Sequence, residues 1–179
     1  MINLKPHEKT SSITRVLCAL SLAVACAPAW SEVNKPKYEM AVFSDAEQGS
    51  KILSGEYDQA IEKINAKSRA ADSFHLQTNL CVAYTKSGNI KAAEQACEEA
   101  VVAAKSLRKI RTTSFAGPAS SQRRARYVAI ALSNRGVVKA VQGDLEAARQ
   151  DFEAAMAERS RISSIESNLE RLNTEDESV

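Results

Sequence analysis

Aromatic residues, glycine and proline are all scarce in this chain. Aromatic residues make up 5% of the 179 residues, and there are only six glycines and four prolines. Strands favour aromatic and β-branched residues, and all-β folds need many turns, so a sheet-rich fold is not expected. Hydrophobic residues still reach 44% and alanine is abundant, which suits closely packed helices. The length allows one domain.

Histidine is almost absent too, with only His7 and His75 in the whole sequence. A nucleophilic serine or cysteine needs a neighbouring base, and a zinc or haem site needs a set of ligands. The sequence supplies neither, and it has no CxxC motif and no glycine-rich phosphate loop. We therefore expect no catalytic activity, no metal and no cofactor.

The first 29 residues have the character of a signal peptide. A polar, basic start precedes the uncharged apolar run at residues 16–27, and Ala27-Pro28-Ala29 offers the small residues that a signal peptidase cleaves. The run is shorter than the roughly 20 residues that span a bilayer. We expect cleavage after Ala29, or alternatively after Ser31, and an exported, periplasmic protein. Lipidation at Cys26 is a further alternative, and it would anchor the same exported protein.

Three windows of the chain share a pattern centred on a glycine. Gly55, Gly88 and Gly143 each separate two helix-like segments. An alanine follows each glycine by five residues, at Ala60, Ala93 and Ala148. A repeated helix hairpin must bury its apolar face against the next copy, and the product is a stacked superhelix with a groove. The pattern thus predicts an all-α fold and a surface that binds another molecule.

The windows resemble tetratricopeptide (TPR) repeats, which are about 34 residues long. The second copy, near residues 74–103, matches the family's core and turn positions at Leu80, Tyr84, Gly88, Ala93 and Ala100. The first copy lies near residues 41–70 and the third near residues 129–158, where Arg135 and Lys139 replace the family's Leu and Tyr. The resemblance implies a TPR-like helical domain at residues 30–172, a short α-solenoid of about three TPR helix hairpins.

A capping helix is expected after the third repeat, at residues 160–172. Its apolar side chains form one stripe: Ile162, Ile165, Leu169 and Leu172. Such a helix can seal the open end of a stack, although it can also bind a partner. Residues 173–179 are acidic, and we expect them to be disordered.

In TPR proteins the first helix of each repeat lines the concave groove, and asparagine there hydrogen-bonds a peptide backbone. Asn79 and Asn134 occupy equivalent places, whereas Ala46 stands there in the first repeat. The resemblance implies a partner-binding groove with these residues: His75, Thr78, Asn79, Val82, Lys86, Ser133, Asn134 and Val137. We expect alanine at both asparagines to weaken binding with little loss of stability. The alternative is that the two asparagines are ordinary surface residues.

Signal-peptide cleavage leaves Cys81 and Cys97 as the two cysteines of an exported protein. The TPR register places both on the interface between the two helices of one hairpin, and so implies a disulfide. Two buried free thiols are the alternative.

Acidic residues are missing from residues 100–142, whereas residues 144–179 are strongly acidic. The basic insert, residues 104–126, carries a patch made of Lys105, Arg108, Lys109, Arg111, Arg123, Arg124 and Arg126. Such asymmetry can attract an anionic surface. We do not expect nucleic acid, because no stacking aromatic residues interleave with the arginines. Alternatively, Arg123, Arg124 and Arg126 pair with the acidic helices that follow.

Two functions are compatible with these features. The first is a non-catalytic scaffold or adaptor in the bacterial cell envelope, which binds an unidentified envelope protein or peptide in the TPR groove. The alternative is an envelope-surface module that docks on anionic lipid or polymer through the basic residues at 105–126.

Overall fold

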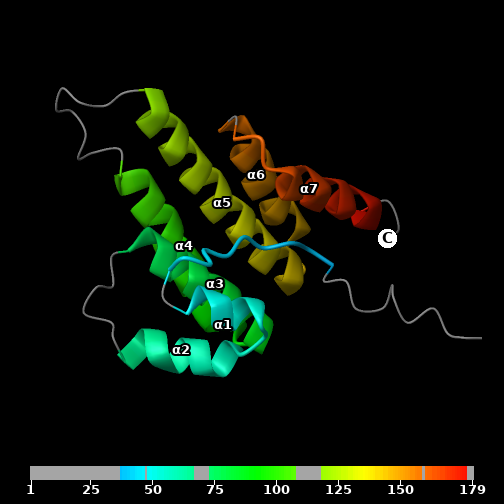
Figure 1. Ribbon diagram of the computed structural model, residues 1–179. Helices are drawn as coiled ribbons and strands as arrows, with labels where there is room; N and C mark the ends of the chain where they lie inside the picture. Colours follow the sequence, from blue (N-terminus) through cyan, green and yellow to red (C-terminus); the bar gives the residue numbers. More distant parts are fainter. Residues whose placement is uncertain (1–36, 47, 67–72, 108–117, 159, 177–179) are drawn as a thin grey trace, which may run out of the picture. The chain divides into compact units, whose positions relative to one another are not determined.

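Helices make up all the regular secondary structure of the described residues, which are 37–46, 48–66, 73–107, 118–158 and 160–176 of a computed structural model. The seven helices are α1 (Gly49–Leu53), α2 (Tyr57–Ala66), α3 (Phe74–Ser87), α4 (Ile90–Ser106), α5 (Pro118–Gln142), α6 (Leu145–Ala157) and α7 (Ser163–Asp176). Each helix packs against the next one along the chain (Figure 1). The predicted all-α class is therefore confirmed.

The predicted glycine turns join α1 to α2, α3 to α4 and α5 to α6. Gly55, Gly88 and Gly143 have φ angles of 84°, 82° and 84°. This left-handed conformation is costly for a residue with a Cβ atom and ends a helix readily when glycine adopts it. Asn89 and Asp144 then cap α4 and α6, because their side chains accept hydrogen bonds from backbone N–H groups of the first turn.

Small residues bring the helices close together. The alanines that follow the turn glycines, Ala60, Ala93 and Ala148, are fully buried. Gly136 of α5 faces the buried ring of Phe152 on α6, and a Cβ atom at Gly136 would lie 2.8 Å from that ring. The sparse aromatic residues thus fit a core whose backbones approach closely.

The ends of the predicted elements differ from the structure in two places. The first repeat was expected from about residue 41, but residues 37–43 carry no helix and α1 is only five residues long. The last helix continues to Asp176, so residues 173–176 of the expected tail are helical. Residues 108–117 of the predicted basic insert lie outside the described part, as does the predicted signal peptide, residues 1–29, with its Cys26. No helix of the described part is long and apolar enough to cross a membrane.

Candidate functional site

Residues 37–43 form an extended strap, drawn in blue in Figure 1, that crosses α3, α5 and α7. Asn79 of α3 holds its last residue by both backbone groups. Its Oδ1 accepts from the N–H of Phe43 at 2.9 Å, and its Nδ2 donates to the carbonyl of Phe43 at 3.0 Å. Asn134 of α5 binds Ala41 in the same way, with both distances 2.9 Å. The two asparagines predicted to bind a peptide backbone thus bind the backbone of their own chain.

A third asparagine, which the sequence reasoning missed, completes the series. Asn168 of α7 accepts from the N–H of Glu39 and donates to its carbonyl, both at 2.8 Å. Arg171, one turn further along α7, donates to the carbonyl of Lys37 at 3.2 Å and forms an ion pair with the Glu39 carboxylate at 3.0 Å. The signal was present in the sequence, because Asn168 follows Asn134 by about one repeat length.

The geometry explains why asparagine serves at all three places. In an extended chain, every second residue directs its N–H and C=O to the same side, so residues 39, 41 and 43 all face the helices. An amide both donates and accepts, and can therefore satisfy both groups of one residue. Asn79, Asn134 and Asn168 are at most 1% exposed. Buried amides of this kind must be paired, because an unpaired one is costly.

The strap's side chains point to either side of this hydrogen-bonded edge. Tyr38 is 4% exposed, and its ring stacks on Phe152 with 6.2 Å between centroids. Met40 and Val42 pack on buried residues of the helices below them. Ala41 and Phe43 pack on a separate buried cluster that includes Phe74 and Ile130. The strap is therefore built into the core by both of its faces.

An aromatic cluster surrounds the end of the strap. The ring centroid of Phe43 lies 4.3 Å from that of His75, 5.3 Å from that of Phe74 and 5.7 Å from that of Tyr127. The Nε2 atom of His75 is buried and has no hydrogen-bond partner among the described residues. Burial lowers the pKa of His75 below its ordinary value, since the charged form would lose its hydration.

Several of the predicted groove residues contact the strap or share a buried cluster with it. Six of them are buried: Thr78, Asn79, Val82, Ser133, Asn134 and Val137. Thr78 is turned inward, and its hydroxyl donates to the carbonyl of Phe74 at 2.8 Å. Val82 and Val137 belong to the clusters that receive Val42 and Tyr38, respectively. His75 is half-buried and Lys86 is exposed. Asn79, Val82, Asn134 and Val137, four of the predicted groove residues, thus contact the chain's own strap or share a buried cluster with it.

The predicted basic patch is described only in part. Lys105, Arg123 and Arg126 are exposed and Arg124 is half-buried, whereas Arg108, Lys109 and Arg111 lie outside the described residues. Within the described ranges, none of the three predicted partners of the acidic helices, Arg123, Arg124 and Arg126, forms an ion pair. Among the described residues, no acidic side chain therefore neutralises these three arginines.

A different pair of bases meets the acidic helices. Arg135 contacts the buried carboxylate of Asp151 through two hydrogen bonds, of 2.8 and 2.6 Å. Lys139 approaches the same carboxylate at 3.1 Å, and Arg135 also pairs with Glu98 on α4. The hydrogen bond to Asp151 is the main cause that raises the pKa of Arg135. Arg135 and Lys139, which replace the Leu and Tyr of the TPR pattern, thus connect α5 with α4 and α6 through ion pairs.

The predicted disulfide between Cys81 and Cys97 is confirmed. It joins α3 to α4, with the two Cα atoms 4.8 Å apart, and both cysteines are fully buried. The bridge lies within the hairpin that carries Asn79, and therefore holds one end of the strap's binding surface in place.

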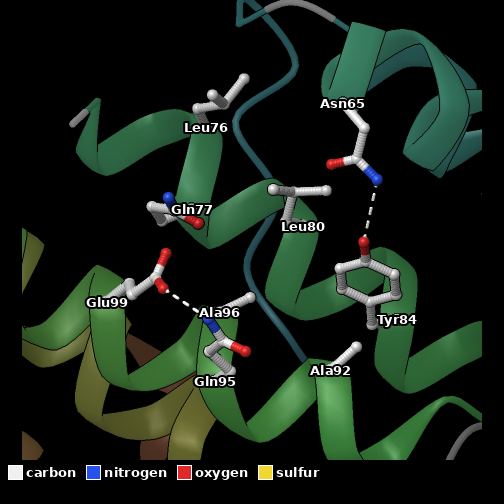
Figure 2. Close-up of a pocket in the computed structure, with 9 residues that line it drawn as sticks. All are labelled: Asn65, Leu76, Gln77, Leu80, Tyr84, Ala92, Gln95, Ala96 and Glu99. Carbon is white, nitrogen blue, oxygen red and sulfur yellow. Dashed lines mark hydrogen bonds between the residues drawn. The ribbon is translucent and has the colours of Figure 1, made fainter. Parts of the chain in front are cut away.

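A pocket of about 240 Å³ lies between α2, α3 and α4 (Figure 2). Two of its polar side chains bond to neighbouring groups: Asn65 donates to the hydroxyl of Tyr84 at 3.0 Å, and Gln95 donates to Glu99 at 3.0 Å. Typical small-molecule sites have volumes of about 300–1,000 Å³. The pocket is therefore a poor match for a ligand site, and the surface of α3, α5 and α7 that binds the strap is the better candidate.

Comparisons with family models, with curated proteins and with solved structures give no match for this chain. The described residues also contain no group of three or more His, Cys, Asp or Glu side chains placed to hold a metal ion. The function must therefore be inferred from the groove and from the exposed charges.

Proposed function

We propose that the chain is a non-catalytic interaction scaffold in the bacterial cell envelope, with TPR-like hairpins stacked as a short α-solenoid. Its groove binds an extended peptide or protein segment. The observation that supports this proposal is that Asn79, Asn134 and Asn168 each pair with both backbone groups of one residue. Such recognition needs an extended backbone and no particular side chain, so a segment of another protein satisfies it equally well.

The strap makes this binding competitive. A partner segment reaches the asparagines only by replacing residues 37–43. A tethered segment competes at an effective concentration on the order of millimolar when its linker is short. A partner must therefore bind tightly or offer further contacts. Its binding releases the strap from the asparagines.

In-cell crosslinking followed by hydrogen exchange tests the proposal. A photo-crosslinking residue at position 75, beside Phe43, should capture a discrete envelope protein, and a crosslinker at the exposed position 91 on α4 is the matched control. When the captured partner is added to the purified chain, the amides of Glu39, Ala41 and Phe43 should lose protection. A partner that binds and leaves these amides protected occupies another surface, and the groove proposal is then wrong.

A second candidate function rests on the exposed bases of α5. Arg123 and Arg126 have no acidic partner within the described residues, so they are available to an anionic lipid or polymer. In a vesicle sedimentation assay, docking should require anionic lipid and fade between low and physiological salt. It should also be lost in Arg123→Glu with Arg126→Glu. Lys91→Glu changes the charge elsewhere on the surface and should keep the binding. Equal binding to neutral vesicles would exclude this function.

A further inference from the structure

The two aromatic residues at the ends of the strap occupy separate binding sites. Tyr38 is buried against Phe152 and Leu172, and Phe43 lies among the rings of Phe74, His75 and Tyr127. The asparagines fix which residues face the helices, and a shift by one residue would exchange the two faces. Each side-chain position of a bound segment therefore meets one defined environment.

One charged side chain, that of Arg171, also contacts the strap. Arg171 pairs with the carboxylate of Glu39 at 3.0 Å, and both side chains are partly exposed, at 37% and 49%. A pair of this kind contributes little to stability. The pair still discriminates between bound segments, because Arg171 attracts an acidic residue at the position of Glu39 and repels a basic residue there. Arg171 thus favours an acidic residue directly after the first aromatic residue of a bound segment.

We propose that the groove selects partner segments that resemble the strap. Such a segment is extended and carries an aromatic residue, an acidic residue, an apolar residue, a small residue, an apolar residue and an aromatic residue in that order, as in Tyr38–Phe43. This inference rests on the proposed function and adds the kind of partner: the strap is an internal copy of the ligand, and Arg171 is a specificity-determining residue.

The tethered strap competes with any added peptide, and the test must allow for this. If the tethered strap acts at about 1 mM, a free peptide with a Kd of about 10 µM for the open groove binds the intact chain about 100-fold more weakly. The strap must therefore be loosened within the full chain. Tyr38→Ala removes the ring that packs on Phe152, and Ala41→Pro removes the N–H that Asn134 accepts.

The probe is a fluorescent peptide with the sequence of residues 37–45, KYEMAVFSD, and the readout is its fluorescence anisotropy. We expect binding to the full chain with Tyr38→Ala and Ala41→Pro, and binding at least about 100-fold weaker to the unchanged chain. A scrambled peptide of the same composition should bind the loosened chain at least 10-fold more weakly than the native order. Circular dichroism establishes that the loosened chain keeps its helices.

A charge exchange in the loosened chain tests the role of Arg171. Arg171→Glu is added to the chain with Tyr38→Ala and Ala41→Pro, because the partly exposed Arg171–Glu39 pair contributes little and its loss alone does not release the strap. We expect this variant to bind the Glu39→Lys peptide more tightly than the native peptide, and the loosened chain with Arg171 to show the opposite preference. Arg161→Glu, which replaces an exposed arginine that forms no hydrogen bond to the strap, is the matched control and should not reverse the preference.

The outcomes separate this inference from the proposed function. Selective binding of the native peptide, with reversal by the charge exchange, supports both. Equal binding of the native and scrambled peptides shows that the groove reads the backbone alone, which overturns the inference and leaves the proposed function standing. If no peptide binds to the folded loosened chain, with Arg171 or with Arg171→Glu, both are wrong. If the double variant loses its helices, the same peptides are tested on the chain with Tyr38→Ala alone, and absence of binding there overturns both.

Discussion

Asn134 binds Ala41 through both of its backbone groups, across 93 positions of sequence. Because Asn134 is 1% exposed, its amide has no access to water that would replace these bonds. Asn134 and the equivalent asparagines therefore stabilise the fold of the chain itself, whether or not they also bind a partner. This changes the expectation, drawn from the sequence, that alanine at these positions leaves stability almost unaltered.

Asn134→Ala should therefore destabilise the fold. It leaves the N–H and the carbonyl of Ala41 without partners, and each unpaired buried group costs about 1–3 kcal/mol. We expect the free energy of unfolding, measured by urea titration, to fall by at least about 1 kcal/mol. Asn173→Ala removes an exposed amide of α7 that accepts a hydrogen bond from Arg149, and as the matched control it should change the free energy of unfolding by less than about 0.5 kcal/mol. Equal effects of the two changes would show that the strap is not held as described.

Asp151 is the buried centre of a charge network, so Asp151→Ala should be more damaging than the loss of an exposed partner. The carboxylate is 6% exposed and pairs with Arg135 and Lys139. Removing it leaves two partly buried cations without their main partner, and breaking a buried pair costs about 3–5 kcal/mol. Glu98→Ala removes the exposed partner of the same arginine and should cost less than about 1 kcal/mol. Thermal unfolding of both variants checks the order, and a larger effect at Glu98 would contradict it.

The helix hairpins were predictable because their signals are local. One short window contains three of these signals: a glycine with a positive φ, a capping Asn or Asp directly after it in two of the hairpins, and a buried alanine five residues after the glycine. The disulfide followed from the register of the same hairpin. Such features depend on neighbours in sequence, and a single chain displays them without any alignment.

The strap was not predictable for the opposite reason. Residues 37–43 form no helix or sheet, and their partners are Asn79, Asn134 and Asn168, far away in sequence. Asn168 lies in a segment whose apolar stripe predicts a cap, and no local signal there marks its amide as a partner of a distant backbone. The spacing from Asn134 marks it as the third member of the series once the strap is known.

Reduction of the Cys81–Cys97 disulfide should lower the stability of the α3–α4 hairpin and with it the strap. The bridge spans 16 positions, and closing a loop of about 15 residues stabilises by about 3 kcal/mol. We expect the urea midpoint of the chain to fall when a reductant is added. The chain with Cys81→Ala and Cys97→Ala should have a low midpoint that the reductant does not change. Two reactive thiols in unreduced, urea-unfolded protein would contradict the bridge.

Stability should fall as the pH drops through the range in which His75 titrates. Burial lowers the pKa of His75 in the fold, whereas the unfolded chain has the ordinary value of about 6.5. Below that value the unfolded chain takes up a proton first, so the contribution of the neutral side chain is complete above about pH 6.5 and is lost as the pH falls toward the lower, folded pKa.

The measurement is the melting temperature at pH 7.5 and at pH 5.5. We expect it to fall more in the unchanged chain than in His75→Leu, which has no titrating group at this position. The hydrogen exchange of the Phe43 amide adds a local readout, because the His75 ring packs directly on the Phe43 ring. If protonation acts through this contact, the amide should exchange faster at pH 5.5 than its intrinsic rate predicts. An equal pH dependence in both chains would show that other groups cause the loss, and that the His75 imidazole does not control the end of the strap.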